Sequence, residues 1–383
     1  MWQSDSLPRE PRALDSRPSK QMTLARDTSI ASVLDKGNNS FGVIRLVLAI
    51  LVIVSHSWSI GGFGFEPLVM TSGGISLGLF AVSGFFCLSG LLVGLGAERS
   101  SPSSYFRRRA GRILPGYWVA LVISGLVFGL LISIIRGLDV RNALLSPANG
   151  SVRTYIVNNF PLSASQYNLG RVLDGMPYPG GINGSLWSLP YEFACYVLIF
   201  VLVKWVLATG EPTRTLMFLF GVSLLIAVLA NKQGPIFVGF GIPILGTLDS
   251  RLFFNLWLGF LAGALLAHVR SRISVSPQLA LASSAVVAVS IPLDIFWPWG
   301  ILAMPTALVG IAHYLPSAFR HVGDKVDISY GMYLYGFPVG QLIVALLGVD
   351  SLSAPLLAAL TIVATLPFAY ASWFGVERYF ATK

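Results

Sequence analysis

Two ionisable residues lie in one apolar stretch of the chain, residues 41–60: Arg45 near its start and His56 near its end. Eleven positions separate them. On an α-helix this spacing brings both side chains onto one face, about 16 Å apart along the axis. If this helix crosses a membrane, ionisable groups in it cost free energy and usually have a function. His56 is therefore a candidate general base.

A carboxylate lies in a second apolar stretch, where Glu192 falls within residues 186–207. If this stretch crosses a membrane in the direction opposite to 41–60, Glu192 and His56 lie at similar depth. A carboxylate beside an imidazole orients the ring and stabilises its cationic form, which suits general-base catalysis. The pair could equally be a hydrogen bond that only ties two helices together. Both interpretations stay open from the residues alone.

A basic segment, residues 105–118, offers a different chemistry. Arg109 and Arg112 are three residues apart, so they share a face on a helix. The planar guanidinium group binds phosphate oxygens in bidentate pairs. With Arg45, these arginines predict an anion site. The alternative is that basic residues at helix ends only fix orientation and contact lipid phosphates.

An aromatic stripe opens the apolar stretch 328–348. Tyr330, Tyr333 and Phe337 share one helical face, and Pro338 follows them. By itself this pattern is typical of helix packing. Small residues at every third or fourth position of 74–97 likewise suit close contact between helices.

Apolar runs of membrane-spanning length must position these residues. Hydrophobic residues make up 54% of the 383-residue chain and charged residues only 11%. The runs are about 17 to 25 residues long, as a bilayer requires. We therefore expect an all-α polytopic membrane protein with about ten transmembrane helices. The predicted spans are 41–60, 74–97, 113–136, 186–207, 215–231, 252–270, 277–294, 298–315, 328–348 and 352–376.

The basic residues predict the orientation of these spans. Most of the 26 Lys and Arg residues fall on one side if both termini are cytoplasmic. This topology accounts for the net charge of +9, so no nucleic-acid partner is expected. Residues 1–40 are polar and aperiodic, which predicts a disordered cytoplasmic tail. Residues 41–380 form the transmembrane domain.

Two connecting segments stand out. The long segment 137–185 is rich in Asn, Ser, Gly, Pro and Tyr, and falls outside the cytoplasm on this topology. It either binds a polyol ligand or only joins two helices. The apolar segment 235–248 is short and broken by Gly and Pro, so we expect a re-entrant or interfacial loop. Cys87 and Cys195 lie in apolar spans and are expected to be buried thiols.

Five motifs, taken together and in order, resemble the membrane acyltransferase-3 family, whose members O-acylate bacterial surface sugars, exopolysaccharides and nodulation signals. The resemblance covers about residues 41–380. Gly336 stands where many members have a histidine, so that position is not the essential base here or the chain belongs to a subgroup that uses glycine. The motifs are Arg-x10-His (Arg45, His56), Phe-Phe-x-Leu-Ser-Gly (Phe85 to Gly90), Arg-x-x-Arg-Ile-Leu-Pro (Arg109, Arg112), Leu-Trp-Ser-Leu-x-x-Glu (Trp187, Ser188, Glu192) and Ser-Tyr-x-x-Tyr-Leu (Ser329, Tyr330, Tyr333).

The resemblance implies a function in the bacterial inner membrane. The donor would be a cytoplasmic acyl-CoA, usually acetyl-CoA, with its phosphates on the predicted anion site. No cofactor would be bound permanently, and no metal site is predicted. The acceptor would be a sugar of an exopolysaccharide, an O-antigen or a lipid-linked glycan. His56 would deprotonate its hydroxyl or carry the acyl group itself, and Glu192 would assist. Further substrate contacts would come from Trp187, Ser188, Tyr330 and Tyr333.

Two other functions fit parts of the sequence. In a proton-coupled transporter or glycan flippase, His56 and Glu192 would form a proton relay. The absence of visible inverted repeats and the basic inner segment argue against this. A relative that only binds glycan is the third possibility. It would not need to keep Arg45, Arg109 and Arg112 together with these two residues.

Overall fold

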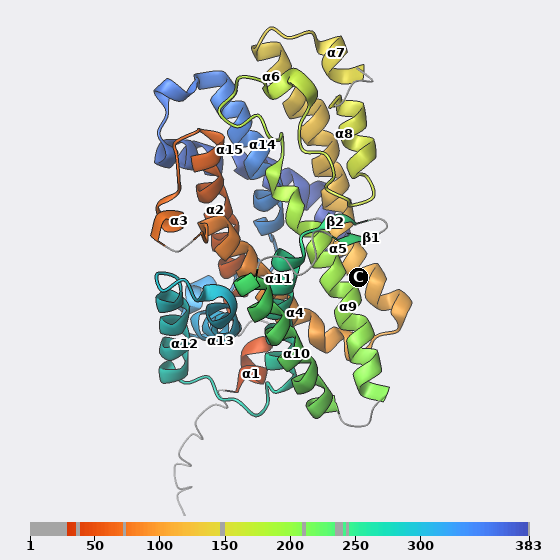
Figure 1. Ribbon diagram of the computed structural model, residues 1–383, viewed down its shortest axis with the longest axis vertical. Helices are drawn as coiled ribbons and strands as arrows, with labels where there is room; N and C mark the ends of the chain where they lie inside the picture. The colour runs from red at the N-terminus through yellow and green to blue at the C-terminus, as the bar shows by residue number, and fades with distance from the viewer. Residues whose placement is uncertain are drawn as a thin grey trace, which may run out of the picture.

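The computed structural model describes residues 29–35, 39–71, 74–145, 150–208, 212–233, 240–242 and 245–381, and helices make up most of it (Figure 1). The only strands in this part of the chain are β1 (Phe240–Ile242) and β2 (Gly246–Leu248), which pair antiparallel. The α-helices are α1 (Ile30–Leu34), α2 (Phe41–Ile60), α3 (Pro67–Thr71), α4 (Leu77–Arg99), α5 (Pro102–Val122), α6 (Gly129–Ile135), α7 (Val140–Leu145), α8 (Val152–Asn159), α9 (Ser188–Ala208), α10 (Pro212–Gln233), α11 (Ser250–His268), α12 (Pro277–Ser290), α13 (Ile301–Tyr314), α14 (Ser329–Leu347), α15 (Ala354–Ser372) and α16 (Arg378–Ala381).

Shorter helical turns connect several of these helices. A π-helical turn, Ile123–Phe128, joins α5 to α6, so that the two form one continuous 34-residue helix, Pro102–Ile135. The other π-helical turns are Phe296–Gly300 and Trp373–Glu377. Turns of 3₁₀ helix cover Gly170–Leu173, Gly184–Trp187, Ser317–Phe319 and Val349–Ser351.

Seven helices in the described residues are long and apolar enough to cross a membrane. They match seven of the ten predicted spans. The other three predictions fall on α4, α12 and α13, which are not among these seven helices. The structure thus confirms an all-helical, multi-pass architecture, while ten crossings and cytoplasmic termini stay predictions. The seven spans are Phe41–Ile60, Pro102–Ile135, Gly184–Trp205, Arg214–Lys232, Ser250–His268, Ser329–Leu347 and Ala354–Phe380.

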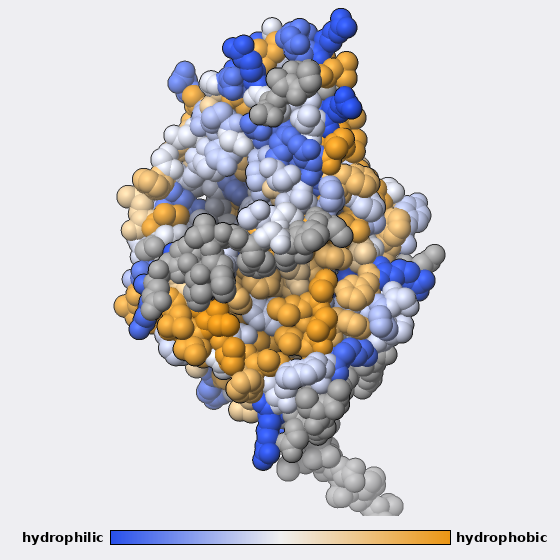
Figure 2. Space-filling model, turned by 45° about the vertical axis from the view of Figure 1, so that its right-hand side comes forward, coloured by the Kyte–Doolittle hydropathy of each residue, from blue (hydrophilic) through white to orange (hydrophobic). Residues whose placement is uncertain are grey.

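The outer surface fits a lipid environment. Figure 2 shows apolar side chains gathered into a broad area over the lower half of one face, while its upper part is mostly polar. On α10, Phe218 is 67% exposed, and on α12, Leu281 is 73% exposed. Large apolar side chains at such exposure favour contact with lipid over contact with water.

The structure of the N-terminal segment differs in part from the prediction. We expected residues 1–40 to form a disordered tail, but residues 30–34 form α1, with Ile30 and Val33 buried. Backbone hydrogen bonds tie this helix down, including one from Ile30 N to Ile273 O (3.0 Å). The tail prediction is therefore wrong for α1. Residues 1–28 and 36–38 lie outside the described residues.

Close packing of α4 against α11 places the helices around the site. A Cβ atom on Gly90 would lie 1.8 Å from the carbonyl oxygen of Phe260, and one on Gly263 would lie 2.2 Å from that of Cys87. The backbones can approach this closely only because both positions lack a side chain. The expectation that small residues in 74–97 serve helix contact is confirmed. Both cysteines are buried and free, as predicted.

The described residues of the segment 137–185, which are 137–145 and 150–185, are folded and attached to the helices. It contains α7 and α8, the upper end of the molecule in Figure 1. Tyr117 OH donates to Asn159 O (2.5 Å), and Asn183 Nδ2 donates to Leu334 O (2.9 Å). Because these bonds reach α5 and α14, the segment is fixed to the helices that carry the site. Of the segment 235–248, residues 235–239 and 243–244 lie outside the described part.

Candidate active site

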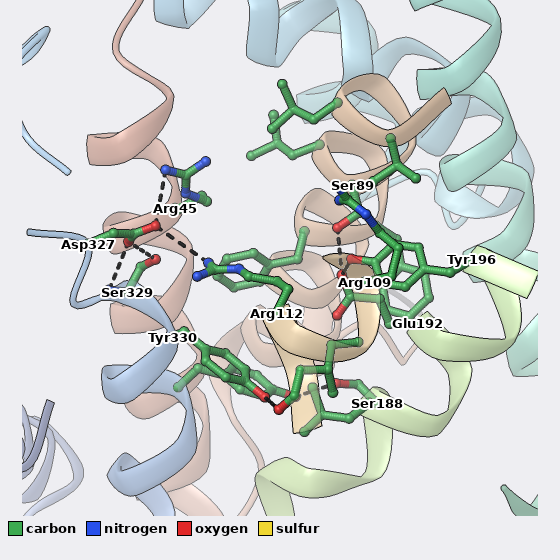
Figure 3. A pocket seen from close by; sticks show the side chains of 18 of the residues that line it. Arg45, Ser89, Arg109, Arg112, Ser188, Glu192, Tyr196, Asp327, Ser329 and Tyr330 are labelled. Atoms are coloured by element: carbon green, nitrogen blue, oxygen red, sulfur yellow. Dashed lines mark hydrogen bonds and ion pairs between the residues drawn. The ribbon is translucent and has the colours of Figure 1, made fainter. Parts of the chain in front are cut away.

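A cavity of about 360 Å³ lies between α2, α4, α5, α9 and the start of α14 (Figure 3). Its lining carries four arginines and two carboxylates, so positive charge is in excess. Seven of the nine predicted site residues belong to it, and His56 and Trp187 do not. The polar and charged lining residues are Arg45, Ser89, Arg108, Arg109, Arg112, Ser188, Glu192, Tyr196, Asp327, Ser329, Tyr330 and Tyr333.

Asp327 connects the arginines of two helices. Its Oδ2 lies 3.1 Å from Arg45 Nη2 and 3.5 Å from Arg112 Nη2, and its Oδ1 accepts from Ser329 Oγ at 2.5 Å. Figure 3 shows the two guanidinium groups converging on this carboxylate. Burial alone would raise the pKa of Asp327, but the charges of Arg45 and Arg112 and the bonds from Ser329 outweigh it, so the pKa lies below its usual value. Asp327 therefore holds the two arginines together as a charged group.

Replacing Asp327 by asparagine is expected to lower the free energy of unfolding by about 1–3 kcal/mol, because a carboxylate that accepts from charged donors is lost. The folded pKa is lowered, so this contribution is complete above about pH 4 and is lost only as the pH falls through the folded value. The difference in thermal stability between wild type and Asp327→Asn should thus be constant from about pH 8 to about pH 5. Unfolding of the detergent-purified proteins measures it.

The matched control for that measurement is Asp324→Asn. The Asp324 side chain is 50% exposed and, among the described residues, pairs only with exposed His321 at 3.6 Å. An exposed pair of this kind contributes little. A stability loss equal in both variants, or one that grows between pH 8 and pH 5, would contradict the role of Asp327.

Aromatic rings and hydroxyl groups also contact the arginines of α5. The Arg112 guanidinium lies 5.4 Å from the centroid of the Tyr330 ring, and that of Arg109 lies 5.8 Å from the Tyr196 ring. Arg108 donates to Ser100 and Ser104. The Nε atoms of Arg45 and Arg109 are buried without a partner among the described residues. The site therefore has donors available for an anionic ligand.

Glu192 points into the opposite side of the cavity. Its Oε1 accepts from Ser89 Oγ at 2.7 Å and from Tyr196 OH at 2.5 Å (Figure 3). Tyr196 stands four residues after Glu192 on α9, so the two share a helical face. No hydrogen bond or ion pair joins Glu192 to His56 in the part of the chain that the structure describes. Similar depth therefore does not make the two residues direct partners.

Tyr333 and Ser188 join α14 to α9 in the cavity lining. Tyr333 OH is 2.5 Å from Ser188 Oγ and donates to Ser185 O at 2.6 Å. The Phe85 ring lies against Tyr333, with centroids 6.0 Å apart. These contacts hold the Phe85–Tyr333 pair in place in the cavity lining.

His56 is not among the residues that line the cavity. Its ring packs edge-on against Phe337, with centroids 4.9 Å apart, and its Nδ1 is buried without a hydrogen-bond partner among the described residues. Phe337 stands one helical turn after Tyr333 on α14. His56 is thus close to the end of the cavity but outside it.

Trp187 is the other predicted residue outside the cavity; its ring packs on Tyr191, with centroids 5.6 Å apart. Several residues of the site were not predicted, among them Tyr196 and Asp327. Tyr196 had a signal, since it is four residues from Glu192 on one helix. Asp327 had none, because an acidic residue just before a helix is usually a solvated loop residue.

The helices and the site define a multi-pass membrane protein with an arginine-lined internal cavity. This chain belongs to the acyltransferase-3 family: the family model described as "Acyltransferase domain" matches residues 38–374. The predicted family is confirmed, and the protein is an acyltransferase.

Two relatives extend the likeness over most of the chain. The "O-acetyl transferase" of Shigella phage Sf6 is 30% identical over 359 residues, covering 90% of this chain and 97% of the relative. "Nodulation protein 10" of Rhizobium leguminosarum bv. viciae is 25% identical over 332 residues, covering 80% of this chain and 84% of the relative. The chain matches no solved structure.

Proposed function

We propose that this acyltransferase is an O-acetyltransferase of the bacterial inner membrane. It moves the acyl group of a cytoplasmic acyl-CoA to a sugar hydroxyl of an exopolysaccharide, an O-antigen or a lipid-linked glycan. The observation that carries this proposal is the arginine-lined cavity, which ends one helical turn short of the residue that contacts His56. The O-acetyl transferase among the relatives supports acetyl as the group transferred.

The donor binds through its phosphates. Arg45, Arg109 and Arg112 present guanidinium groups to one cavity, and this group pairs well with phosphate oxygens. Asp327 keeps the side chains of Arg45 and Arg112 extended toward each other, which lowers the entropy lost when an anion binds. The volume of about 360 Å³ falls at the lower end for small-molecule sites, so it suits part of a CoA molecule.

The acyl group reaches His56 along α14. Ser329, Tyr333 and Phe337 are spaced four residues apart, so they line one face of this helix over about 12 Å. The first two line the cavity, and the third contacts His56. The acyl group must pass the Phe85–Tyr333 pair to arrive there. Rotation of the Phe85 side chain, which has no hydrogen bond to break, would open this path.

His56 acts as the general base. It takes the proton from the sugar hydroxyl while the hydroxyl oxygen attacks the thioester carbonyl carbon. A new C–O bond forms, the C–S bond breaks, and the electron pair leaves with the CoA sulfur, which then takes up a proton. The products are the O-acyl sugar and CoA. Glu192, held by Ser89 and Tyr196, contributes negative charge to the cavity and does not contact the base.

Acetyl transfer by purified protein tests this function. The protein is reconstituted in proteoliposomes with radiolabelled acetyl-CoA and host surface polysaccharide that has been deacetylated with mild alkali. We expect label in the polysaccharide and release of free CoA in equal amounts. Proton-coupled uptake of a solute that needs no CoA, with no label transferred, would instead identify a transporter.

A further inference from the structure

The surroundings of His56 differ from those of the arginines. Its side chain is partly exposed, yet it does not line the cavity that holds Arg45 and Arg112. Val47, the most exposed large apolar residue of α2, stands nine positions before it, which is about half a turn away around the helix. His56 therefore faces away from that exposed side and toward α14. The partial exposure of His56 therefore lies outside the cavity that the arginines line.

The segment 174–183 lies next to His56. The Phe337 ring contacts both the His56 ring and the Tyr178 ring, with Phe337 and Tyr178 centroids 5.5 Å apart. Tyr178 is only partly buried, and its neighbours Pro177 and Pro179 are exposed. The Tyr178 ring is thus an accessible aromatic surface, one ring away from the base.

This segment is held rigidly in place. Gln341 Nε2 donates to Tyr178 O at 2.9 Å and to Gly181 O at 2.8 Å. A Cβ atom on Gly62, which has a φ of +66°, would lie 2.9 Å from the Pro177 side chain. The turn that follows α2 therefore packs directly on the segment. The ring of Tyr178 has a fixed position relative to His56.

Near Phe337, two buried polar atoms have no hydrogen-bond partner among the described residues. They are His56 Nδ1 and Oε1 of Gln341, a fully buried side chain. Gln341 stands one helical turn after Phe337, on the same face of α14. A buried polar atom without a partner is costly, so these atoms indicate a site for a ligand with hydroxyl groups.

We propose that Tyr178 forms one wall of the acceptor site and binds the sugar ring whose hydroxyl His56 deprotonates. A pyranose has an apolar C–H face that packs on an aromatic ring, and hydroxyls that bond to polar groups around it. Acceptor and donor then approach from opposite sides of the Phe85–Tyr333 pair. The inference rests on the proposed function, since it names where the acceptor of that reaction binds.

Acceptor kinetics test the role of Tyr178. The variants are Tyr178→Leu, which keeps apolar bulk against Phe337 but removes the aromatic ring, and Tyr178→Phe, which keeps the ring. With mild-alkali-deacetylated polysaccharide, Tyr178→Leu should raise the KM for polysaccharide about tenfold or more. Its KM for acetyl-CoA and its rate of acetyl-CoA hydrolysis without polysaccharide should stay within about twofold of wild type. Tyr178→Phe should resemble wild type. The control is Tyr370→Leu, an exposed tyrosine of α15.

The outcomes separate this inference from the proposed function. An unchanged polysaccharide KM in Tyr178→Leu, or an equal fall in transfer and hydrolysis, would overturn the acceptor site. If wild type transfers no acetyl to polysaccharide, the proposed function fails. Binding of the same polysaccharide without donor, measured by thermophoresis, then decides the inference: weaker binding by Tyr178→Leu than by Tyr178→Phe supports it, and equal binding overturns it.

Discussion

Replacing His56 by alanine is expected to lower acetyl transfer to polysaccharide by about 10²–10⁴-fold, the usual contribution of a general base. The loss should appear in kcat, with the KM for acetyl-CoA nearly unchanged, because His56 does not line the arginine cavity. Release of labelled CoA and incorporation of labelled acetyl measure both quantities.

Two controls make this result specific. His313→Ala changes a histidine of α13, whose ring packs on Tyr314, and should transfer acetyl at the wild-type rate. Mass spectrometry of wild type mixed with acetyl-CoA alone looks for acetyl bound to His56. Its presence would assign the attack on the thioester to the imidazole nitrogen, in place of direct transfer to the sugar. A His56→Ala variant that folds and retains more than a tenth of the wild-type kcat would remove His56 from the mechanism.

Replacing Arg112 by alanine should raise the KM for acetyl-CoA by about 10- to 100-fold, because a hydrogen bond to a charged group contributes about 1.5–3 kcal/mol. The change removes the group that contacts both Asp327 and the Tyr330 ring at the cavity wall. Arg112→Lys should recover only part of the loss, since an ammonium group cannot form the bidentate pair or stack in the same way. Initial rates over a range of acetyl-CoA concentrations measure this.

The matched control is Arg107→Ala. Arg107 is on the same helix, five residues earlier, but it is exposed and does not line the cavity. Arg107→Ala removes one positive charge from the same helix, as Arg112→Ala does. If Arg107→Ala and Arg112→Ala raise the KM equally, the arginines act only through the general surface charge. The cavity would then not be the donor site.

Local patterns in the sequence predicted the helix that carries Arg45 and His56. The apolar run gave α2 with the observed bounds, and the spacing of eleven residues placed both side chains on one face. These features depend only on helix geometry, which is the same in every α-helix. The arginines of α5 could be recognised for the same reason. Their spacing of three puts them on one side of whatever helix they form, and both line the cavity.

The family was also determined by the sequence, because five motifs in order are a property of the chain and need no coordinates. The contacts between the site residues were not determined by the sequence. Depth in a membrane can be counted along a helix, so Glu192 and His56 could be placed at a similar level. The rotation of each helix and the choice of its neighbours depend on packing between residues far apart in the chain. That packing gives Glu192 the hydroxyl of Ser89, from a helix more than a hundred residues away.

Packing between residues far apart in the chain also explains the contacts of Asp327 and Tyr178. Asp327 is 282 positions from Arg45 and 215 from Arg112, yet it pairs with both. Tyr178 reaches Phe337 because Gln341 holds its backbone. The sequence by itself determined the family, the helical fold class and the candidate site residues. Only the tertiary structure decided which of them meet, since closely packed helices such as α4 and α11 allow a single arrangement of their side chains.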